Sequence, residues 1–502
     1  MQTLGQEEDT ALEKHVFDVI IVGAGFSGIG MARHLRAKFN DNFLVLEKGN
    51  HIGGVWRDNT YPAAACDAPS HLYSFSFYTN YPWSRRFAPQ AEILAYLNSC
   101  VVRFHLEPFI RLNQEVYSAK WDNESALWFV QSKDENYKCR SIIWATGQLN
   151  RPNIPKLNGI ESFKGVAFHS AEWRHDIDLS GKRVAVIGTG SSAIQFCPEI
   201  VKVVKELVIY QRSPGYVRPK PEVTYTEKQL ALFNRFPLIR KIDRLKFYFQ
   251  NEYRYTFFEN RRKNLKAQNG FKVTLENIIS DATLRQKLTP SYLLGCKRGL
   301  PSNEWIPMFK LPNVSLRTEE IIEVDPEGIM TSSGAIQKTD VIIYATGFRA
   351  THFLEPIKII GLNEAFLHSQ WSAGACAYLG MTVSGFPNMF ILYGPNTNLG
   401  HTSVLFMLET QFDYIMKALK HVFRRNILEV RKDVDRVYNE KLQRNLENSV
   451  MVQGGCTSWY KNNDGRVTNN WPGFSFAYRL QARFRKSDYK IISRASSWEP
   501  DC

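Results

Sequence analysis

Two glycine-rich loops, each between an apolar strand and a helical segment, constrain the fold of this 502-residue chain most strongly. Residues 16–22, VFDVIIV, predict a buried parallel strand, because they are apolar and rich in β-branched side chains. Residues 23–28, GAGFSG, follow this strand and open a helix, and residues 43–46 predict the next strand. The order repeats where strand 183–187 leads into residues 188–193, GTGSSA. Each loop has the pattern that lets a pyrophosphate approach a helix N-terminus.

The residue at the end of the second strand of each unit indicates which nucleotide the unit binds. Glu47 lies 24 residues after Gly23, and a carboxylate there accepts hydrogen bonds from both ribose hydroxyls of an unphosphorylated nucleotide. Arg212 lies 24 residues after Gly188, and its guanidinium suits a 2′-phosphate, which a carboxylate would repel. The first unit is therefore expected to bind FAD or NAD, and the second NADP. The alternative is that both loops only pack a helix on a strand.

The rest of the chain is interpreted as completing these two units. Residues 141–144 and 340–344 predict further strands, and both are followed by Ala-Thr-Gly. Residues 221–290 are rich in charged and aromatic residues with few Gly or Pro, which predicts a helical insertion. We therefore expect an α/β protein with two Rossmann-like dinucleotide-binding domains, for FAD and NADP. The expected boundaries are 1–150 and 348–502 for the FAD-binding domain, 151–220 and 291–347 for the NADP-binding domain, and 221–290 for the insertion.

The charge of the chain is uneven. Its 63 Lys and Arg against 49 Asp and Glu give a net charge of +14, and residues 212–272 contribute 15 basic and 5 acidic residues to it. Nucleic-acid binding is one interpretation, but no nucleic-acid motif accompanies the charge. We favour a solvated helical face or steering of an anionic cofactor. No run of 18 apolar residues predicts a membrane helix, and the polar residues 1–14 predict no signal peptide, so a cytoplasmic protein is expected.

The eight cysteines are scattered, and no two are closer than 30 residues. This spacing excludes CxxC redox pairs and zinc ribbons, and it predicts free thiols in a reducing compartment rather than a disulfide scaffold. No metal site is expected. Two nucleotides in one chain imply hydride transfer from nicotinamide to flavin. Without a paired-cysteine relay, the reduced flavin is expected to pass its electrons to dioxygen.

Three further motifs resemble one family. Residues 163–173, FKGVAFHSAEW, fit the FxGxxxHxxxW fingerprint of type I Baeyer–Villiger monooxygenases, which use FAD and NADPH. Residues 53–67 resemble the family's GGxWxxxxYPxxxxD pattern, and residues 296–298, Cys-Lys-Arg, resemble its basic pair. Residues 455–466 and 471–473 resemble the branch that includes 4-hydroxyacetophenone monooxygenase. The fingerprint positions in this chain are Phe163, Gly165, His169 and Trp173.

The resemblance implies a flavoprotein monooxygenase that uses NADPH and O₂ to insert oxygen into a ketone. The product would be an ester or lactone, formed through a C4a-peroxyflavin, and sulfoxidation is a further expected activity. Arg298 would supply a cation beside the reacting oxygens, and Asp67 would orient it through a bidentate pair.

The resemblance also implies roles for residues around the nucleotides. Lys297 would join Arg212 at the 2′-phosphate, Trp459 would pack over NADP, and His169 would couple domain rotation to the state of the cofactor. For Trp459 and His169 the alternatives are an ordinary core residue and a structural histidine. Further residues expected at the cofactors are Gly25, Phe26, Ser27, Gly28, Gly54, Val55, Trp56, Tyr73, Val116, Thr189, Gly190, Ser191, Ser192, Ala193 and Ser213.

Three rival functions stay open. A flavin-containing monooxygenase would oxygenate soft sulfur or nitrogen, although that family usually has Tyr or Phe where Trp173 stands. A redox sensor would bind both nucleotides and oxidise NADPH only slowly, releasing hydrogen peroxide. The basic, aromatic residues 243–258 would suit a membrane surface, but they suit a helical lid over an apolar substrate equally well. The expected partners are a ketone or thioether and O₂, without nucleic acid or membrane, in a monomer or homodimer.

Overall fold

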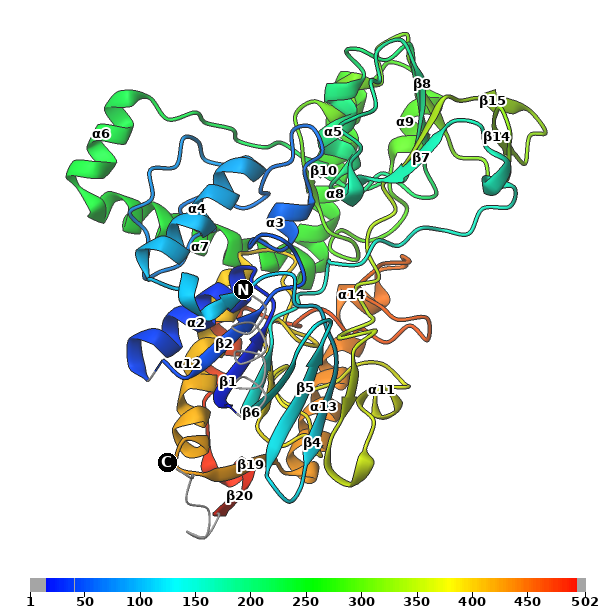
Figure 1. Ribbon diagram of the computed structural model, residues 1–502. Helices are drawn as coiled ribbons and strands as arrows, with labels where there is room; N and C mark the ends of the chain where they lie inside the picture. Colours follow the sequence, from blue (N-terminus) through cyan, green and yellow to red (C-terminus); the bar gives the residue numbers. More distant parts are fainter. Residues whose placement is uncertain (1–14, 40, 494–502) are drawn as a thin grey trace, which may run out of the picture.

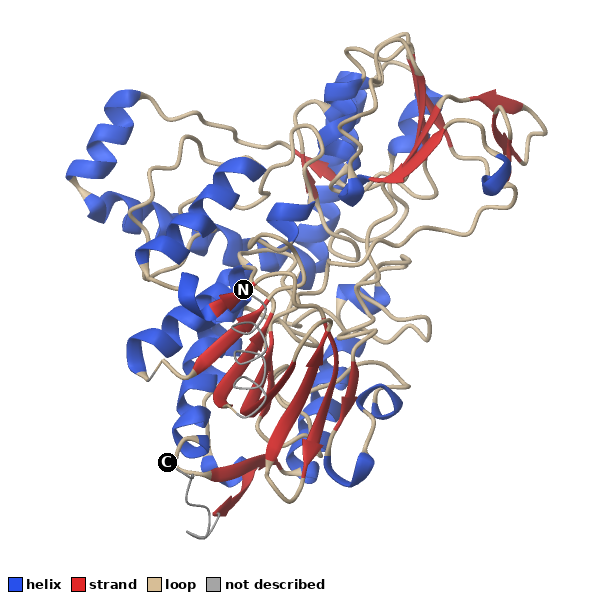
Figure 2. Cartoon of the chain, in the orientation of Figure 1, coloured by secondary structure: helices blue, strands red, loops and turns tan. Residues whose placement is uncertain are grey.

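The computed structural model describes residues 15–39 and 41–493, which form two units built on separate sheets (Figures 1 and 2). Two expectations fall outside these residues, namely that 1–14 contain no signal peptide and that Cys502 is a free thiol. In Figure 1 the larger sheet lies at the lower part of the molecule and the smaller one at the upper right. Loops and several helices, rather than strands, occupy the region between them (Figure 2).

The first unit is centred on β1 (Val16–Val22), whose parallel neighbours are β2 (Phe43–Leu46) and β6 (Asn136–Trp144). The strand order of its eight-stranded sheet is β17-β4-β5-β6-β1-β2-β3, and β18 also pairs with β6. The helices α2 (Phe26–Lys38) and α12 (Val404–Val422) pack against each other beside this sheet. The other strands are β3 (Ile110–Arg111), β4 (Val116–Asp122), β5 (Leu127–Ser132), β17 (Lys358–Ile360) and β18 (Met389–Ile391).

The second unit is a five-stranded parallel sheet with the order β12-β9-β8-β16-β7. Its middle strand, β8 (Arg183–Ile187), leads through the second glycine loop into α5 (Ala193–Ile200). The strand after α5, β9 (Glu206–Tyr210), is buried from Leu207 to Tyr210. The other strands are β7 (Val166–His169), β12 (Val314–Arg317) and β16 (Val341–Tyr344), with β13 (Ile321–Asp325), β14 (Gly328–Thr331) and β15 (Ile336–Lys338) in a small antiparallel sheet.

The helical insertion contacts both units. Its helices are α6 (Glu227–Arg235), α7 (Pro237–Glu259), α8 (Arg261–Ile278) and α9 (Ala282–Leu288). In Figure 1, α6 and α7 lie beside α4 of the first unit, whereas α8 lies beside α5. Asp243 of α7 accepts a hydrogen bond from His71 at 2.7 Å, and Glu252 accepts one from Ser475 Oγ at 2.7 Å. These buried contacts fix α7 onto the first unit although its sequence lies within the second.

The remaining elements connect these parts. The segment 454–474 between α14 and α15, called here the C-terminal loop, returns from the first unit toward the insertion. The remaining helices are α3 (Val55–Asp58), α4 (Gln90–Arg103), α10 (Trp305–Met308), α11 (Leu367–Gln370), α13 (Lys432–Glu447), α14 (Val450–Gln453) and α15 (Ser475–Gln481). Short strands are β10 (Val217–Arg218), β11 (Leu300–Pro301), β19 (Asn426–Val430) and β20 (Tyr489–Ser493). The 3₁₀ helices are η1 (Glu107–Phe109), η2 (Ile160–Ser162), η3 (Ser170–Glu172), η4 (Leu362–Glu364) and η5 (Lys486–Asp488).

The predicted strands 16–22, 43–46 and 183–187 agree with β1, β2 and β8. The strand predicted at 141–144 is the buried end of the longer β6, whose first half extends toward β5. Helix α4 was not predicted from the sequence. Its buried side chains include Ile93, Tyr96 and Leu97, which recur at helical spacing.

Candidate active site

The first glycine loop is packed so tightly that its glycines cannot be replaced freely. Gly23 has a φ of +110°, and a Cβ there would lie 2.6 Å from the carbonyl oxygen of Ala145, at the end of β6. A Cβ on Gly28 would lie 1.8 Å from the Gly23 carbonyl oxygen. Gly25, in contrast, would meet only the Cα of Gly54 within ordinary contact distance, at 3.7 Å. Gly23 and Gly28 are thus packed against the backbone, whereas Gly25 has no such close contact. Space at Gly25 is what an approaching phosphate requires.

Glu47 follows β2 and is buried, with 4% of its surface exposed. Its Oε2 accepts a hydrogen bond from the Ala24 amide at 2.8 Å, which ties the carboxylate to the glycine loop. Its Oε1 accepts from the Gly49 amide at 2.8 Å and from Arg57 Nη1 at 2.7 Å. Because each carboxylate oxygen has two lone-pair directions, the fixed group keeps acceptor capacity for a ribose hydroxyl. The residues of the first loop therefore fit an unphosphorylated adenosine ribose.

The second glycine loop repeats the packing of the first. Gly188 has a φ of +109°, and a Cβ there would lie 2.4 Å from the carbonyl oxygen of Ala345, at the end of β16. Ala193 is completely buried at the start of α5, where the first loop has Gly28. A Cβ on Gly190 would meet nothing within 4 Å. Both predicted Ala-Thr-Gly segments therefore abut the first glycine of their own loop.

Arg212 and Lys297 come from distant parts of the second unit and lie near each other. Burial and the neighbouring Arg212 charge lower the pKa of Lys297. The Lys297 ammonium donates a hydrogen bond to Ser213 Oγ. Two cations beside a serine hydroxyl are a donor set that suits a phosphate, whose charge would relieve their repulsion. The fold thus brings together Arg212 and Lys297, which were expected at the 2′-phosphate, with Ser213, which was expected at the cofactors.

Arg298 and Asp67 meet between the two units. Arg298 Nη2 donates to Asp67 Oδ2 at 3.2 Å, and the side chains are 37% and 11% exposed. The expected bidentate pair is therefore not formed, because one hydrogen bond joins the two side chains and the other carboxylate oxygen lies 3.4 Å from Gln195 Nε2. Burial is the largest single influence on Arg298 and opposes its charge, but the Asp67 carboxylate together with Tyr460 and Tyr393 raises the pKa of the guanidinium. Arg218 lies near the Arg298 and Asp67 charges, and its pKa falls to about 10 because of burial and the nearby Arg254. The site is therefore positively charged, with Asp67 as the carboxylate that contacts Arg298.

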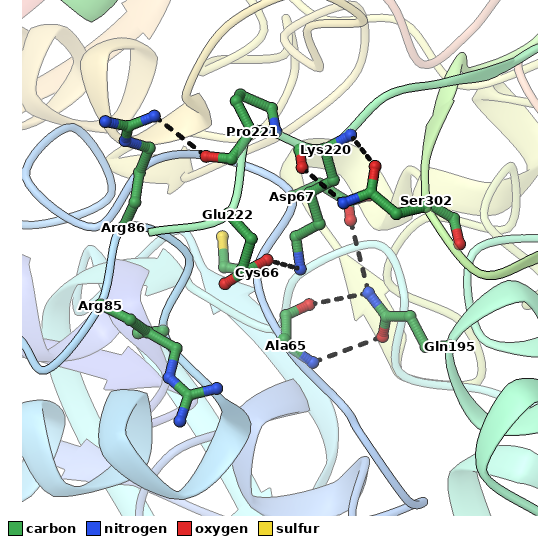
Figure 3. A network of polar contacts seen from close by, with 12 residues as sticks. Ala65, Cys66, Asp67, Arg85, Arg86, Gln195, Lys220, Pro221, Glu222 and Ser302 are labelled. Carbon is green, nitrogen blue, oxygen red and sulfur yellow. Dashed lines mark hydrogen bonds and ion pairs between the residues drawn. The ribbon is translucent and has the colours of Figure 1, made fainter. Parts of the chain in front are cut away.

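Gln195 of α5 is a site residue that the sequence did not indicate (Figure 3). Its amide spans the two units: Nε2 donates to the Ala65 carbonyl oxygen at 3.1 Å, and Oε1 accepts from the Ala65 amide at 3.3 Å. Nε2 also lies 3.4 Å from Asp67 Oδ1, and Tyr61 Oη donates to Oε1 at 3.0 Å. The side chain therefore holds the loop that carries Asp67 against the second unit. A helical glutamine shortly after a glycine loop carries no motif, so only the structure reveals this role.

The fingerprint residues have structural roles in the second unit. A Cβ on Gly165 would lie 2.3 Å from the Asp340 carbonyl oxygen and 2.5 Å from the Phe163 ring, so glycine allows both to approach. His169 is buried at the end of β7, and burial lowers its pKa. Its ring centroid is 5.7 Å from that of Phe348, beside the second Ala-Thr-Gly segment. Trp173 packs its ring on α5, next to Gln195, with a centroid distance of 5.2 Å to Phe196.

The other predicted cofactor residues are found around the two loops. Gly54 has a φ of +55° and precedes α3, so Val55 and Trp56 begin that short helix. Trp56 Nε1 donates to Tyr73 Oη at 3.1 Å, and Phe26 meets the Tyr73 ring at 5.0 Å. The remaining predicted residues are Ser27 on α2, Val116 at the start of β4, and Thr189, Ser191 and Ser192 directly before α5.

The C-terminal loop reaches the same region. Trp459 stacks edge-on against Tyr460, with ring centroids 4.6 Å apart, and Tyr460 is fully buried. Burial raises the pKa of Tyr460, and the nearby Arg298 charge partly offsets this rise, so this part of the loop lies near the cation. A pocket adjoins this point between α7, the loop before α12 and the C-terminal loop. Its lining includes Tyr255, Phe258, Lys297, His401, Tyr460 and Trp471.

The expectation of scattered free thiols is wrong for two cysteines. Cys296 and Cys456 form a disulfide across a sequence separation of 160 residues. Their spacing in the sequence gives no sign of this pairing, because the fold alone brings the two segments together. The described free cysteines are Cys66, Cys100, Cys139, Cys197 and Cys376.

The described residues contain neither a metal-binding cluster nor a membrane-spanning helix. No three His, Cys, Asp or Glu side chains in residues 15–39 and 41–493 are grouped so that they could hold a metal ion. None of the helices in the same residues has both the length and the apolar character to cross a membrane.

Comparisons with known proteins agree with this geometry. The family model described as pyridine nucleotide-disulphide oxidoreductase matches residues 20–283. The chain is 43% identical over 481 residues to a Baeyer–Villiger monooxygenase of Pseudomonas aeruginosa, covering 95% of this chain and 91% of that protein. Its fold matches a closed crystal structure of cyclohexanone monooxygenase with a TM-score of 0.86 at 26% identity, over 96% of this chain and 100% of that one.

A third similar protein is OTEMO, whose crystal structure in complex with FAD and NADP matches with a TM-score of 0.85 at 26% identity. The match covers 95% of this chain and 99% of that one. These likenesses confirm the expected α/β fold with two Rossmann-like domains.

Proposed function

The chain belongs to the pyridine nucleotide-disulphide oxidoreductase family and, more narrowly, to the Baeyer–Villiger monooxygenases, and we propose the following reaction for it. The enzyme uses NADPH and dioxygen to insert one oxygen atom into a ketone, which yields an ester or lactone. FAD and NADP are its cofactors, as in the complex of its structural relative. When bound, FAD accepts a hydride from NADPH and activates dioxygen.

The two loops divide the work of holding these cofactors. The loop around Gly23 and the carboxylate of Glu47 hold the FAD adenosine, because that carboxylate is buried and fixed at the end of β2. The loop around Gly188 holds the NADPH pyrophosphate at the start of α5. Arg212 and Lys297 bind the 2′-phosphate, since they lie close to each other and charge repulsion lowers the pKa of Lys297. This division is the physical basis for a preference for NADPH over NADH.

The Arg298–Asp67 pair is the single observation that carries the oxygenase proposal. Arg298 Nη2 lies 3.2 Å from Asp67 Oδ2 between the two units. Cofactor binding alone does not require such a guanidinium held by a carboxylate. A fixed cation stabilises the negative charge that develops on oxygen when a ketone carbonyl is attacked. Asp67 orients the guanidinium, and Gln195 orients the Asp67 loop. Arg298 is thus the proposed catalytic residue, and Asp67 and Gln195 are positioning residues.

The pocket beside Lys297 supports a ketone with an apolar body. Tyr255 and Phe258 of α7 face Trp471 of the C-terminal loop across it. Aromatic walls with a few polar groups are typical of sites for small organic molecules. The space enclosed is only about 20 Å³, far less than a ketone needs, so α7 would have to move, as a lid does, to admit the substrate. A thioether of similar shape is the expected second substrate class.

The broader assignments follow from the same proposal. We assign 1–150 and 348–502 to the FAD-binding domain, 151–220 and 291–347 to the NADP-binding domain, and 221–290 to the insertion. The excess positive charge of the insertion steers anionic NADPH rather than nucleic acid. The enzyme is proposed to act in the cytoplasm on small molecules, as a monomer or homodimer.

The test is a product analysis with the purified holoenzyme. The enzyme is first reduced by NADPH without oxygen, and an aerated ketone solution is then added. An ester in stoichiometric relation to the NADPH consumed supports the proposal. A product from a thioether but from no member of a ketone panel would favour oxygenation at soft sulfur or nitrogen. Hydrogen peroxide as the sole product with both substrates would overturn oxygenase function.

A further inference from the structure

The Cys296–Cys456 disulfide joins the two segments that meet at the proposed catalytic cation. Cys296 directly precedes Lys297 and Arg298, in the loop between α9 and β11. Cys456 lies in the C-terminal loop, four residues before Tyr460. The bond therefore links the phosphate-binding and catalytic cations covalently to the loop that covers them.

The surroundings are shaped around this bond. A Cβ on Gly454 would lie 2.6 Å from Cys296 Cβ and 2.9 Å from its Sγ, so a side chain at this position would collide with the pair. The Leu293 amide donates to the Gly454 carbonyl oxygen at 2.9 Å, which brings the two backbones together beside the sulfurs. Gly455, directly before Cys456, has a φ of +77°. Gly454 thus allows the C-terminal loop to approach Cys296 closely. Together the two glycines give the loop backbone conformational freedom once the bond is broken.

The two sulfurs differ in their access to solvent. Cys296 is completely buried, whereas Cys456 is only half-buried. A small thiol therefore attacks the Cys456 sulfur and leaves Cys296 as the departing thiolate. That thiolate is next in sequence to Lys297 and Arg298, whose positive charges stabilise it.

The free cysteines are poor competitors for this chemistry. Burial raises the pKa of Cys66 and of Cys100 to about 12, so both are neutral thiols at physiological pH. Burial also raises the pKa values of Cys139 and Cys197. Since the thiolate is the reactive form, redox chemistry among the described cysteines concentrates on the bonded pair.

We propose that Cys296 and Cys456 form a reversible redox site that regulates the coupling of NADPH oxidation to oxygen insertion, an inference that rests on the proposed function. In the disulfide state the bond fixes the loop that carries Trp459 and Tyr460 against the Arg298 segment. In the dithiol state the glycines free the loop, NADPH is held less firmly, and more of its electrons end as hydrogen peroxide.

The oxidant that closes the disulfide is hydrogen peroxide, which the enzyme itself releases when oxygen insertion fails. Hydrogen peroxide oxidises the two thiols, so that one S–S bond forms, the O–O bond breaks and two water molecules leave. A dithiol reductant reverses the step by exchange, becoming a disulfide while both cysteines regain their protons. Because poor coupling releases the peroxide that closes the bond, the site works as negative feedback. A reducing compartment keeps the pair open until peroxide accumulates.

The experiment compares the holoenzyme in its two redox states. Non-reducing peptide mapping measures the 296–456 cross-link after treatment with dithiothreitol or with hydrogen peroxide. NADPH consumption, peroxide and ester are then measured for wild type, Cys456→Ser and Cys376→Ser. Cys456→Ser removes the disulfide at its half-buried partner, where a hydroxyl is tolerated. Cys376→Ser is the matched control, because Cys376 is a free, half-buried cysteine.

The dithiol wild type and Cys456→Ser are expected to share a KM for NADPH about fivefold higher than the disulfide form, with more peroxide per NADPH and unchanged FAD content. Peroxide treatment restores wild type and Cys376→Ser, but not Cys456→Ser. Equal KM and coupling in both states, or free thiols at both positions after peroxide, would overturn the redox site. If neither state makes an oxygenated product, the proposed function fails, and the KM for NADPH still decides the redox site.

Discussion

Arg298 donates a hydrogen bond to Asp67 across the boundary between the two units, at 3.2 Å and over 231 residues of sequence. The other oxygen of the same carboxylate lies 3.4 Å from Gln195 Nε2. Both donors belong to the second unit, whereas Asp67 belongs to the first. The orientation of the cation therefore depends on how the two units dock, which makes the residues of the boundary sensitive positions for the reaction.

Gln195→Leu is expected to weaken oxygen insertion without removing either cofactor. The leucine has nearly the same size but cannot bond the Ala65 backbone or Asp67, so the loop loses its anchor to α5. Loss of these bonds should lower kcat for ester formation about 10- to 100-fold, with FAD content unchanged. Steady-state kinetics and the flavin absorbance measure the two effects. Gln337→Leu, at a glutamine that bonds Glu206 away from the site, should leave kcat unchanged. Equal losses in both variants would contradict a positioning role for Gln195.

The two glycine loops respond differently to an added methyl group. Gly28→Ala places a Cβ 1.8 Å from the Gly23 carbonyl oxygen, so the variant is expected to lose FAD or to fail to fold. Gly190→Ala meets no atom within 4 Å and should fold with its FAD, but the methyl group should raise the KM for NADPH. Flavin content and thermal unfolding check the first variant, and steady-state kinetics the second. A Gly190→Ala enzyme with unchanged NADPH kinetics would contradict the placement of the pyrophosphate at that loop.

The preference for NADPH over NADH is expected to depend on Arg212. Arg212→Ala removes a charge-assisted hydrogen bond to the 2′-phosphate and should weaken NADPH binding about 10- to 100-fold. NADH binding should hardly change, since NADH lacks that phosphate. Titration of the oxidised enzyme with NADP⁺ and NAD⁺ measures both. Arg235→Ala, at an exposed arginine of α6, is the control for a general change in charge. Equal use of NADPH and NADH by the wild type would contradict this assignment.

The pH dependence of NADPH use should reflect Lys297. Its pKa is lowered by burial and by Arg212, so the free enzyme loses this charge at a lower pH than an ordinary lysine would allow. The kcat/KM for NADPH should therefore be constant at low pH and fall as the pH rises through that lowered pKa. Lys297→Arg should move the fall to higher pH, because a guanidinium stays charged. An identical fall with NADH as the donor would argue against Lys297 as its origin.

The glycine loops could be predicted because their signal is local. A strand, a short loop of mostly small residues and a helix follow each other directly, and Glu47 and Arg212 each lie 24 residues after the first glycine of their loop. The contact of Gly23 with Ala145 and of Gly188 with Ala345 then explains why both strands end in the same Ala-Thr-Gly sequence.

Two features of the site could not be predicted, because they depend on docking between distant segments. Gln195 reaches Ala65 over 130 residues, and Cys296 reaches Cys456 over 160. No periodicity or spacing records such pairs, and the scattered cysteines even favoured free thiols. The family resemblance indicated Arg298 and Asp67 as a bidentate pair, whereas one hydrogen bond joins them in the structure.

The decisive variant is Arg298→Ala. Hydride transfer depends on the placement of the two cofactors, so the variant should bind FAD and should still be reduced by NADPH. Ester formation should almost vanish, because the oxyanion loses the cation that is positioned to stabilise it. Arg298→Lys should rescue poorly, since an ammonium cannot reproduce the planar contact with Asp67. Stopped-flow reduction, ester yield and peroxide release measure the three steps separately. Wild-type rates of ester formation by Arg298→Ala would remove Arg298 from the mechanism and shift the weight to oxygenation of sulfur or nitrogen, which needs no such cation.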